Sequence, residues 1–199
     1  MSWCPVLQLS EREVSALYNT MCGLESRWIP SVSGEGREGS HPAVSFPLWS
    51  FVRGIQRAEA YFIEKRLGRM PRFLDVGCGI GTKVLLVQQW GWEADGLDFV
   101  PEYCEAAREL CGALSAITCV DAREYDNYGT YDLVYAYRPL VDMDETMKLT
   151  IWMAEQLKPG ALMFLAWWPE FDSSLLEKIS DEILDRQLAI SQGGLWMRV

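Results

Sequence analysis

The chain has 199 residues, of which 49% are apolar and 23% are charged, and this composition suits one globular domain with a full core. Its formal net charge of −10 disfavours nucleic acid as a partner, because an acidic protein repels phosphate backbones. No run of 18 apolar residues is present, so no membrane span is expected.

Cysteine and histidine usage indicates the compartment and argues against a metal site. The six cysteines are scattered through the sequence without a C-x-x-C pair. This usage predicts reduced thiols in a cytoplasmic protein rather than a disulfide framework or a zinc site. The single histidine, His41, is too few for most histidine-based metal centres. No basic or apolar leader opens the sequence, so no signal peptide is expected.

Residues 1–70 predict two helices and a loop, which we interpret as a helical extension or cap on the main body. A capping-box pattern at Ser10 starts the first helix, and Pro30 is expected to end it. Residues 31–45 are rich in Gly, Ser and Glu, which is typical of a loop. A second helix follows Pro47.

An apolar strand pattern at 73–76 leads into three glycines at alternate positions, Gly77, Gly79 and Gly81. Glycines let the backbone turn sharply and approach a ligand where any Cβ would clash. Residues 82–90 then predict a helix, whose first turn presents free N–H groups and a positive dipole end. The stretch therefore predicts a site for a small ligand, such as a nucleoside derivative.

From residue 73 onward strand and helix patterns alternate, which predicts an α/β fold with a doubly wound, mainly parallel sheet. The expected strands are 73–76, 94–98, 116–120, 132–137 and 162–167, and the expected helices are 82–90, 101–111 and 142–157. The tail predicts a helix over about 172–184 and then an antiparallel hairpin made of 186–190 and 195–198. The sheet would thus have seven strands within a ligand-binding domain spanning 71–199.

Acidic residues end three of the predicted strands, at Asp75, Asp98 and Asp121. Because the carboxyl ends of parallel strands meet at one edge of the sheet, these side chains are expected to line one crevice. Asp98 can accept both hydroxyls of a ribose, and Phe99 can lie against an adenine face. Asp121 and the backbone N–H of Ala122 can read an adenine edge. A single carboxylate at a strand end is more often a turn or cap residue, but three of them favour a nucleoside site.

The order and spacing of these motifs resemble those of class I S-adenosylmethionine-dependent methyltransferases. Residues 73–81 resemble the first motif of that family and 96–102 the second, while Asp121–Ala122, 131–135 and 157–161 resemble the later ones. A nicotinamide dinucleotide competes for the same glycines. It prefers G-x-G-x-x-G, however, and the third glycine here comes one residue early.

The resemblance implies S-adenosylmethionine as the cofactor. Its methionine part would lie at the glycine loop, its ribose at Asp98, and its adenine among the residues after the second and third strands. The expected cofactor-binding residues are Asp75, Gly77, Cys78, Gly79, Asp98, Phe99, Asp121 and Ala122. No metal is expected, because the Asp-Asn pair of metal-dependent catechol-type enzymes is missing.

The stretch after the fourth predicted strand is where this family usually encodes its acceptor. It carries neither the Asn/Asp-Pro-Pro-aromatic signature of many amino methyltransferases nor the Pro-Cys of cytosine C5 enzymes. We expect a small molecule or a protein side chain as acceptor, with Tyr137 and Arg138 facing the methyl group. In the alternative interpretation, Tyr137 packs in the core and Arg138 pairs with an acidic neighbour.

Two other functions stay open at this stage. The chain could be a catalytically silent partner subunit that keeps the fold and the cofactor. It could also be an aminopropyl transferase whose acidic residues Asp142, Asp144 and Glu145 grip a polyamine. Further aromatic residues are weaker candidates for the acceptor site: Trp167 and Trp168 as a wall, and Trp49 together with His41 as a lid.

Overall fold

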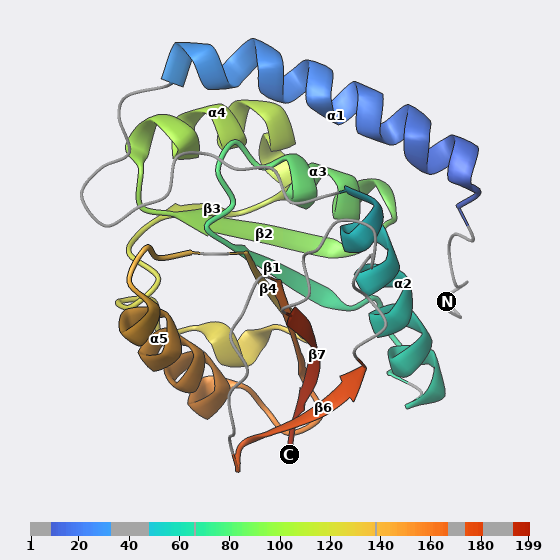
Figure 1. Cartoon of the computed structure of the whole chain (residues 1–199), viewed down its shortest axis with the longest axis vertical. Coiled ribbons are helices and arrows are strands. Elements are labelled where there is room, and N and C mark those ends of the chain that lie inside the picture. The colour runs from blue at the N-terminus through green and yellow to red at the C-terminus, as the bar shows by residue number, and fades with distance from the viewer. Residues whose placement is uncertain (1–8, 33–47, 66, 138, 167–173, 181–192) are drawn as a thin grey trace.

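The computed structural model describes residues 9–32, 48–65, 67–137, 139–166, 174–180 and 193–199. These residues form a seven-stranded sheet of order β3-β2-β1-β4-β5-β7-β6, with helices on both faces (Figure 1). The parallel strands are β1 (Arg72–Val76), β2 (Glu93–Asp98), β3 (Ile117–Cys119), β4 (Leu133–Tyr137) and β5 (Leu162–Ala166). Antiparallel β7 (Gly193–Arg198) lies between β5 and β6 (Leu176–Ser180). The predicted sheet class is confirmed.

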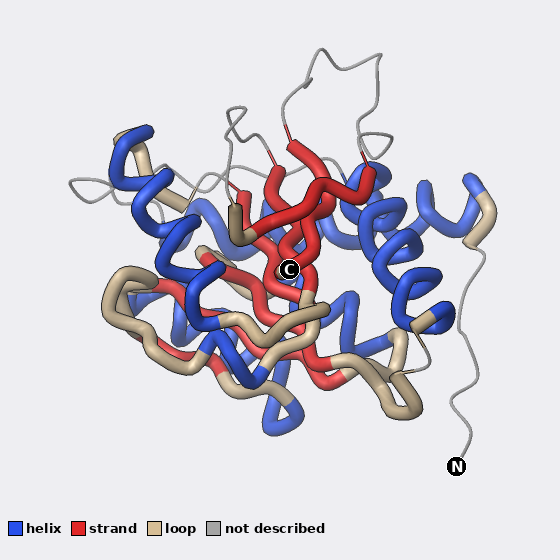
Figure 2. The backbone as a smooth tube through the Cα atoms, turned by 90° about the horizontal axis from the view of Figure 1, so that it is seen from below, coloured by secondary structure: helices blue, strands red, loops and turns tan. Residues whose placement is uncertain are grey.

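The helices divide unequally between the two faces of the sheet. One face carries α2 (Leu48–Glu64), α3 (Thr82–Gln89) and α4 (Pro101–Cys111), and α1 (Glu11–Val32) packs against these three helices. The opposite face carries α5 (Met143–Gln156). Figure 2 shows the strands in the middle of the molecule with helices on either side. Among the described helices, none is long and apolar enough to cross a membrane.

Helix α2 approaches the sheet closely through an aromatic cluster. Phe51 contacts Tyr135 edge-on, with ring centroids 5.0 Å apart, and the Tyr135 and Phe164 centroids are 5.1 Å apart. Gly54 lies directly over Phe164, because a Cβ at this glycine would fall 2.2 Å from the ring. The second helix therefore packs directly into the main core.

The start of α1 follows the sequence prediction, whereas its end does not. Ser10 N–H donates to Glu13 Oε2 at 2.7 Å, and Glu13 N–H donates to Ser10 Oγ at 3.4 Å, so the capping box is confirmed. The helix runs on to Val32, and the expectation that Pro30 ends it is wrong. A proline two residues from the end of a 22-residue helix removes only one backbone hydrogen bond, which the rest of the helix tolerates.

The predicted tail helix over 172–184 is also wrong, because Leu176–Ser180 is strand β6. This strand pairs antiparallel with β7, buries Leu176, and places the Lys178 ammonium 5.5 Å from the centre of the Trp196 ring. Pairing with a distant strand thus overrides the local helical pattern. The strand expected at 186–190 lies outside the described residues.

Strand β1 marks the point where the order of the sheet reverses. It pairs with β2 on one side and with β4 on the other. The crossovers leave on opposite faces here, so a crevice opens beyond the carboxyl ends of these strands. The glycine loop and the strand-end carboxylates lie at this edge.

Candidate cofactor-binding site

The glycine loop joins β1 to α3 in a left-handed backbone conformation. The φ angles of Gly77, Gly79 and Gly81 are 77°, 54° and 82°. A Cβ at Gly79 would meet nothing within 4 Å, and one at Gly77 would meet only Pro139, at 3.8 Å. A Cβ at Gly81, in contrast, would lie 2.9 Å from Cys111 Sγ. The first two glycines therefore leave space for a ligand, whereas the third allows α4 to pack against the loop.

Asp98 ends β2 and holds this loop in place. Its Oδ2 accepts a hydrogen bond from Gly79 N–H at 2.9 Å, and its Oδ1 accepts one from Val100 N–H at 2.9 Å. The residue is 7% exposed, and burial raises the pKa of the carboxyl against the lowering effect of these N–H groups. A carboxylate oxygen has about two acceptor positions, so both oxygens can still accept a ribose hydroxyl.

Asp75 lies in β1, in register with Tyr135 of β4. It is 2% exposed, and burial raises its pKa to about 7, with Lys83 opposing the shift and Asp98 adding to it. The carboxyl is thus balanced between its neutral and charged forms near neutral pH. A cationic ligand group placed beside it would favour the charged form.

Asp121 follows β3, and its carboxylate is held by Arg123. Arg123 Nε lies 3.0 Å from Oδ1 and Nη2 lies 2.6 Å from Oδ2, and the backbone N–H of Arg123 also donates to Oδ1 at 2.9 Å. These bonds lower the pKa of Asp121. In the part of the chain that the structure describes, the N–H of the adjacent Ala122 has no acceptor. Sequence reasoning missed Arg123, although an Asp-x-Arg spacing at a turn is a weak signal for such a pair.

Three buried thiols fasten the backbone around this edge. Cys78 Sγ lies 3.6 Å from Gly79 O, Cys104 Sγ lies 3.2 Å from Asp98 O, and Cys111 Sγ lies 3.4 Å from the carbonyl oxygen of Gly81. Burial raises the pKa of Cys104 to about 12 and that of Cys111 to about 11, so both stay protonated donors. Sequence reasoning names Cys78 only as a cofactor-binding residue, and it misses Cys104 and Cys111, because their role depends on how α4 packs.

The structure describes only some of the other residues that the sequence predicts for the site. Phe99 directly follows Asp98 and is half-buried. Tyr137 ends β4 and is partly buried against the core cluster to which α2 contributes. Arg138 lies outside the described residues, as do His41, Trp167 and Trp168. Trp49 on α2 is half-buried, with the Arg53 guanidinium 5.2 Å from the centre of its ring.

The acidic residues considered for polyamine binding are mostly engaged elsewhere. Asp142 caps α5 by accepting the N–H of Glu145 at 2.9 Å. Glu145 pairs with Lys148 at 2.7 Å and with Arg123 at 3.4 Å. Their positions are explained by helix capping and ion pairing. Within the described ranges, no group of three His, Cys, Asp or Glu side chains is placed to hold a metal ion.

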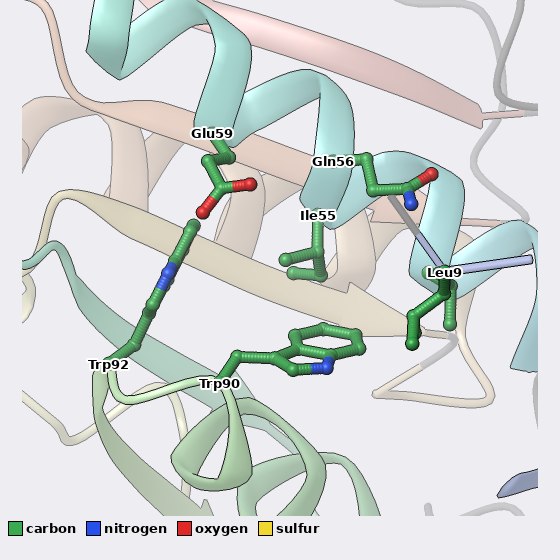
Figure 3. Close-up of a pocket in the computed structure, with 7 residues that line it drawn as sticks. Leu9, Ile55, Gln56, Glu59, Trp90 and Trp92 are labelled. Carbon is green, nitrogen blue, oxygen red and sulfur yellow. The ribbon is translucent and has the colours of Figure 1, made fainter. Parts of the chain in front are cut away.

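A separate hollow lies away from this edge, where the α3–β2 turn meets α2. It is lined by Trp90 and Trp92 from the turn, by Ile55 and Glu59 from α2, and by Leu9, with the two indoles facing α2 (Figure 3). Its lining is mainly apolar, and Trp90 and Trp92 precede β2, at the amino end of that strand. This hollow belongs to the packing between α2 and the α3–β2 turn and not to the crevice at the carboxyl ends.

The residues at the crevice fit S-adenosylmethionine chemically. Open glycine backbone and the half-neutral Asp75 suit an amino acid moiety, the acceptors of Asp98 suit a ribose, and a carboxylate beside the available N–H of Ala122 suits the edge of adenine. This donor and acceptor set arises from three different segments of the chain: the end of β1 with the glycine loop, the end of β2, and the turn after β3.

Comparison with known proteins agrees with this geometry. Residues 73–160 match the family model described as a methyltransferase domain. An RNA methyltransferase from Salinibacter ruber, solved with S-adenosyl-L-homocysteine, has a TM-score of 0.55 and 16% identity over 78% of this chain and 92% of that chain. CalS10, an amino pentose methyltransferase from Micromonospora echinaspora solved with SAM, has a TM-score of 0.49 and 22% identity over 70% of this chain and 65% of that chain. No curated protein matches the sequence.

At 16% identity, the Salinibacter ruber structure supports the fold and says nothing of the acceptor. The family model covers the glycine loop, both later carboxylates and the strands that carry them. Residues 73–160 are therefore similar to methyltransferase domains, and the fold of the described residues is the one seen in the S-adenosyl-L-homocysteine-bound methyltransferase from Salinibacter ruber.

Proposed function

We propose that this methyltransferase acts on a small molecule or on a protein side chain. The observation that carries the proposal is the charge around the crevice. Asp75, Asp98 and Asp121 all lie at this edge, and residues 71–199 hold 21 acidic against ten basic side chains. Such a surface disfavours a polyanionic acceptor and suits a neutral or cationic one.

The chemistry needs little from the protein beyond binding and orientation. Bound S-adenosylmethionine supplies an electrophilic methyl group on a sulfonium, which an acceptor attacks in line. On the protein side, we assign the ribose to Asp98, the adenine edge to Asp121 and Ala122, and the amino acid end to Asp75 and the glycine loop. Tyr137, which ends β4 at this edge, stays a candidate for the acceptor side, and so does Arg138 as the next residue in the sequence.

The test is transfer of a labelled methyl group in cell extract that has been separated into small molecules, protein and nucleic acid. We expect label in the small-molecule or protein fraction, and loss of it in Asp98→Ala. The matched control is Asp144→Ala, which removes an exposed carboxylate on α5. Label confined to nucleic acid would overturn the proposed acceptor class.

Two further outcomes of the same assay identify the alternatives. Binding of S-adenosylhomocysteine without any labelled product would favour a partner subunit, which the core packing of Tyr137 also fits. Product formed only from the decarboxylated cofactor would favour an aminopropyl transferase, although Asp142 and Glu145 already serve as a helix cap and an ion-pair partner.

We further propose a reducing, cytoplasmic location. Cys78, Cys104 and Cys111 are free thiols buried around the cofactor edge, where they donate to backbone carbonyls. A reducing compartment keeps such donors intact. Fractionation of cells that express a tagged chain tests this location.

A further inference from the structure

The Asp121–Arg123 pair has a geometry that fixes one carboxylate in one orientation. The guanidinium of Arg123 donates to both carboxylate oxygens of Asp121, two residues earlier in the chain. Its Nε donates to Oδ1 at 3.0 Å, and its Nη2 donates to Oδ2 at 2.6 Å. The backbone N–H of Arg123 adds a second bond to Oδ1 at 2.9 Å. With three donors on two oxygens, the carboxylate cannot rotate about its last torsion without losing hydrogen bonds.

The same bonds decide which acceptor position remains. Oδ1 receives two donors and Oδ2 receives one, so the remaining position is on Oδ2. The neighbouring Ala122 N–H has no acceptor among the described residues. An acceptor and a donor side by side match the 6-amino group and N1 of adenine. A 6-oxo purine presents the reverse pattern, with an oxygen at position 6 and a hydrogen on N1.

Arg123 also forms an ion pair with the start of α5. Its Nη1 lies 3.4 Å from Glu145 Oε2 in the first turn of α5, and Glu145 also pairs with Lys148 at 2.7 Å. The side chains of Arg123 and Asp121 are 50% and 26% exposed. An ion pair this exposed contributes little to folding stability, so its two-point geometry calls for an explanation other than stability.

We propose that Arg123 is a positioning residue that holds the Asp121 carboxylate to accept the cofactor's 6-amino group, and so selects a 6-amino purine over a 6-oxo purine. This inference rests on the proposed placement of adenine at Asp121 and Ala122. Arg123 acts through Asp121 and does not itself contact the base. A lysine cannot replace it, because an ammonium is a point charge without the planar two-donor edge.

The experiment measures the dissociation constants of S-adenosylhomocysteine and of S-inosylhomocysteine by calorimetry. The proteins are the full chain, Arg123→Met, Arg123→Lys, Asp121→Ala and the double variant Arg123→Met/Asp121→Ala. Arg57→Met is the matched control, since Arg57 is an exposed arginine on α2. Thermal melting of each variant checks that it is folded.

We expect the unchanged chain to prefer the adenosyl ligand by about 10-fold to 100-fold, which corresponds to one hydrogen bond to a charged group. Arg123→Met should lower this preference at least about threefold with a melting temperature close to that of Arg57→Met. Arg123→Lys should not restore the preference. The double variant should discriminate no worse than Asp121→Ala alone, because Arg123 works only through that carboxylate.

Two results would overturn the inference. They are an unchanged ligand preference in Arg123→Met, including the case in which the affinities for both ligands fall equally, and an extra loss of preference in the double variant. Failure of the unchanged chain to bind either ligand would instead contradict the proposed function, so the two failures are distinguishable.

Discussion

The Asp98 carboxylate accepts the N–H of Gly79 at 2.9 Å, which joins the end of β2 to the glycine loop after β1. The Asp98 side chain therefore fixes the conformation of the glycine loop and also presents hydrogen-bond acceptors to the crevice beside it. Cys104 donates to the carbonyl of the same aspartate at 3.2 Å, so the backbone at this strand end is held as well. The loop is preorganised by its neighbours rather than by glycine content alone.

Removal of this carboxylate should weaken cofactor binding steeply. We expect Asp98→Ala to bind S-adenosylhomocysteine about 10-fold to 100-fold more weakly, because the ribose would lose its proposed charged acceptor and the Gly79 N–H loses its hydrogen-bond partner. Asp98→Asn keeps one acceptor oxygen and should lose less affinity. Isothermal titration measures both variants against Asp144→Ala. Unchanged affinity in Asp98→Ala would remove this residue from the site.

The glycines of the loop should separate into two kinds. Gly79→Ala and Gly81→Ala both force a left-handed alanine, which costs about 1–2 kcal/mol. Gly81→Ala also drives a Cβ to 2.9 Å from Cys111 Sγ, which adds about 1–3 kcal/mol of overpacking. We therefore expect Gly81→Ala to lose more folding stability than Gly79→Ala. Relative to the stability that each variant loses, Gly79→Ala should lose more affinity for S-adenosylhomocysteine.

Chemical denaturation and calorimetry on the same two variants check this separation. A second alanine change, Gly81→Ala with Cys111→Ala, serves as control because it removes the contacted sulfur and should recover part of the lost stability. Equal stability of Gly79→Ala and Gly81→Ala would contradict the assignment of a packing role to Gly81.

Strands β1, β2, β4 and β5 were placed within one residue of each observed end from the sequence, for a physical reason. Buried parallel strands are short apolar runs, and each of these runs is bounded by glycine, aspartate or proline nearby. The capping box of α1 was predicted because it depends on residues three apart. In contrast, β6 exists only because distant β7 pairs with it, and no local pattern records such a partner.

The site shows the same division. Asp75, Asp98 and Asp121 could be proposed because each lies within two residues of the carboxyl end of a strand, and topology alone then brings them to one edge. Arg123 and Cys104 could not, because their roles come from contacts with a carboxylate and a carbonyl that only the folded chain supplies. Likewise, the sequence alone could not separate the open glycines, Gly77 and Gly79, from the packing glycine, Gly81, because that distinction depends on where α4 and Pro139 lie.

Gly54 should be required for the packing of α2. A Cβ at this position would fall 2.2 Å from Phe164, so Gly54→Ala should destabilise the fold by about 1–3 kcal/mol in spite of the better helix propensity of alanine. Gly23→Ala in α1 is the matched control. Nothing lies within 4 Å of its added Cβ, and it should gain up to about 1 kcal/mol. Urea unfolding measures both, and equal effects would contradict the close approach.

The titration of Asp75 should make the stability of the ligand-free protein fall as pH rises. Burial raises the pKa of its carboxyl in the folded state to about 7 from an ordinary value of 3.8. The folded state therefore holds this proton more tightly than the unfolded state. The resulting stabilisation is complete below about pH 4 and is lost as pH rises through 7. Asp75→Asn should remove this part of the pH dependence in melting curves taken between pH 5 and 8.

Cofactor binding should show the opposite trend, because the ammonium of the amino acid moiety favours ionised Asp75. We expect the affinity for S-adenosylhomocysteine to rise between pH 6 and 8, by at most about tenfold per pH unit, with release of a proton. Calorimetry in two buffers of different ionisation enthalpy measures that release. Asp75→Asn should release none, and an identical release from the variant would assign the proton to another group.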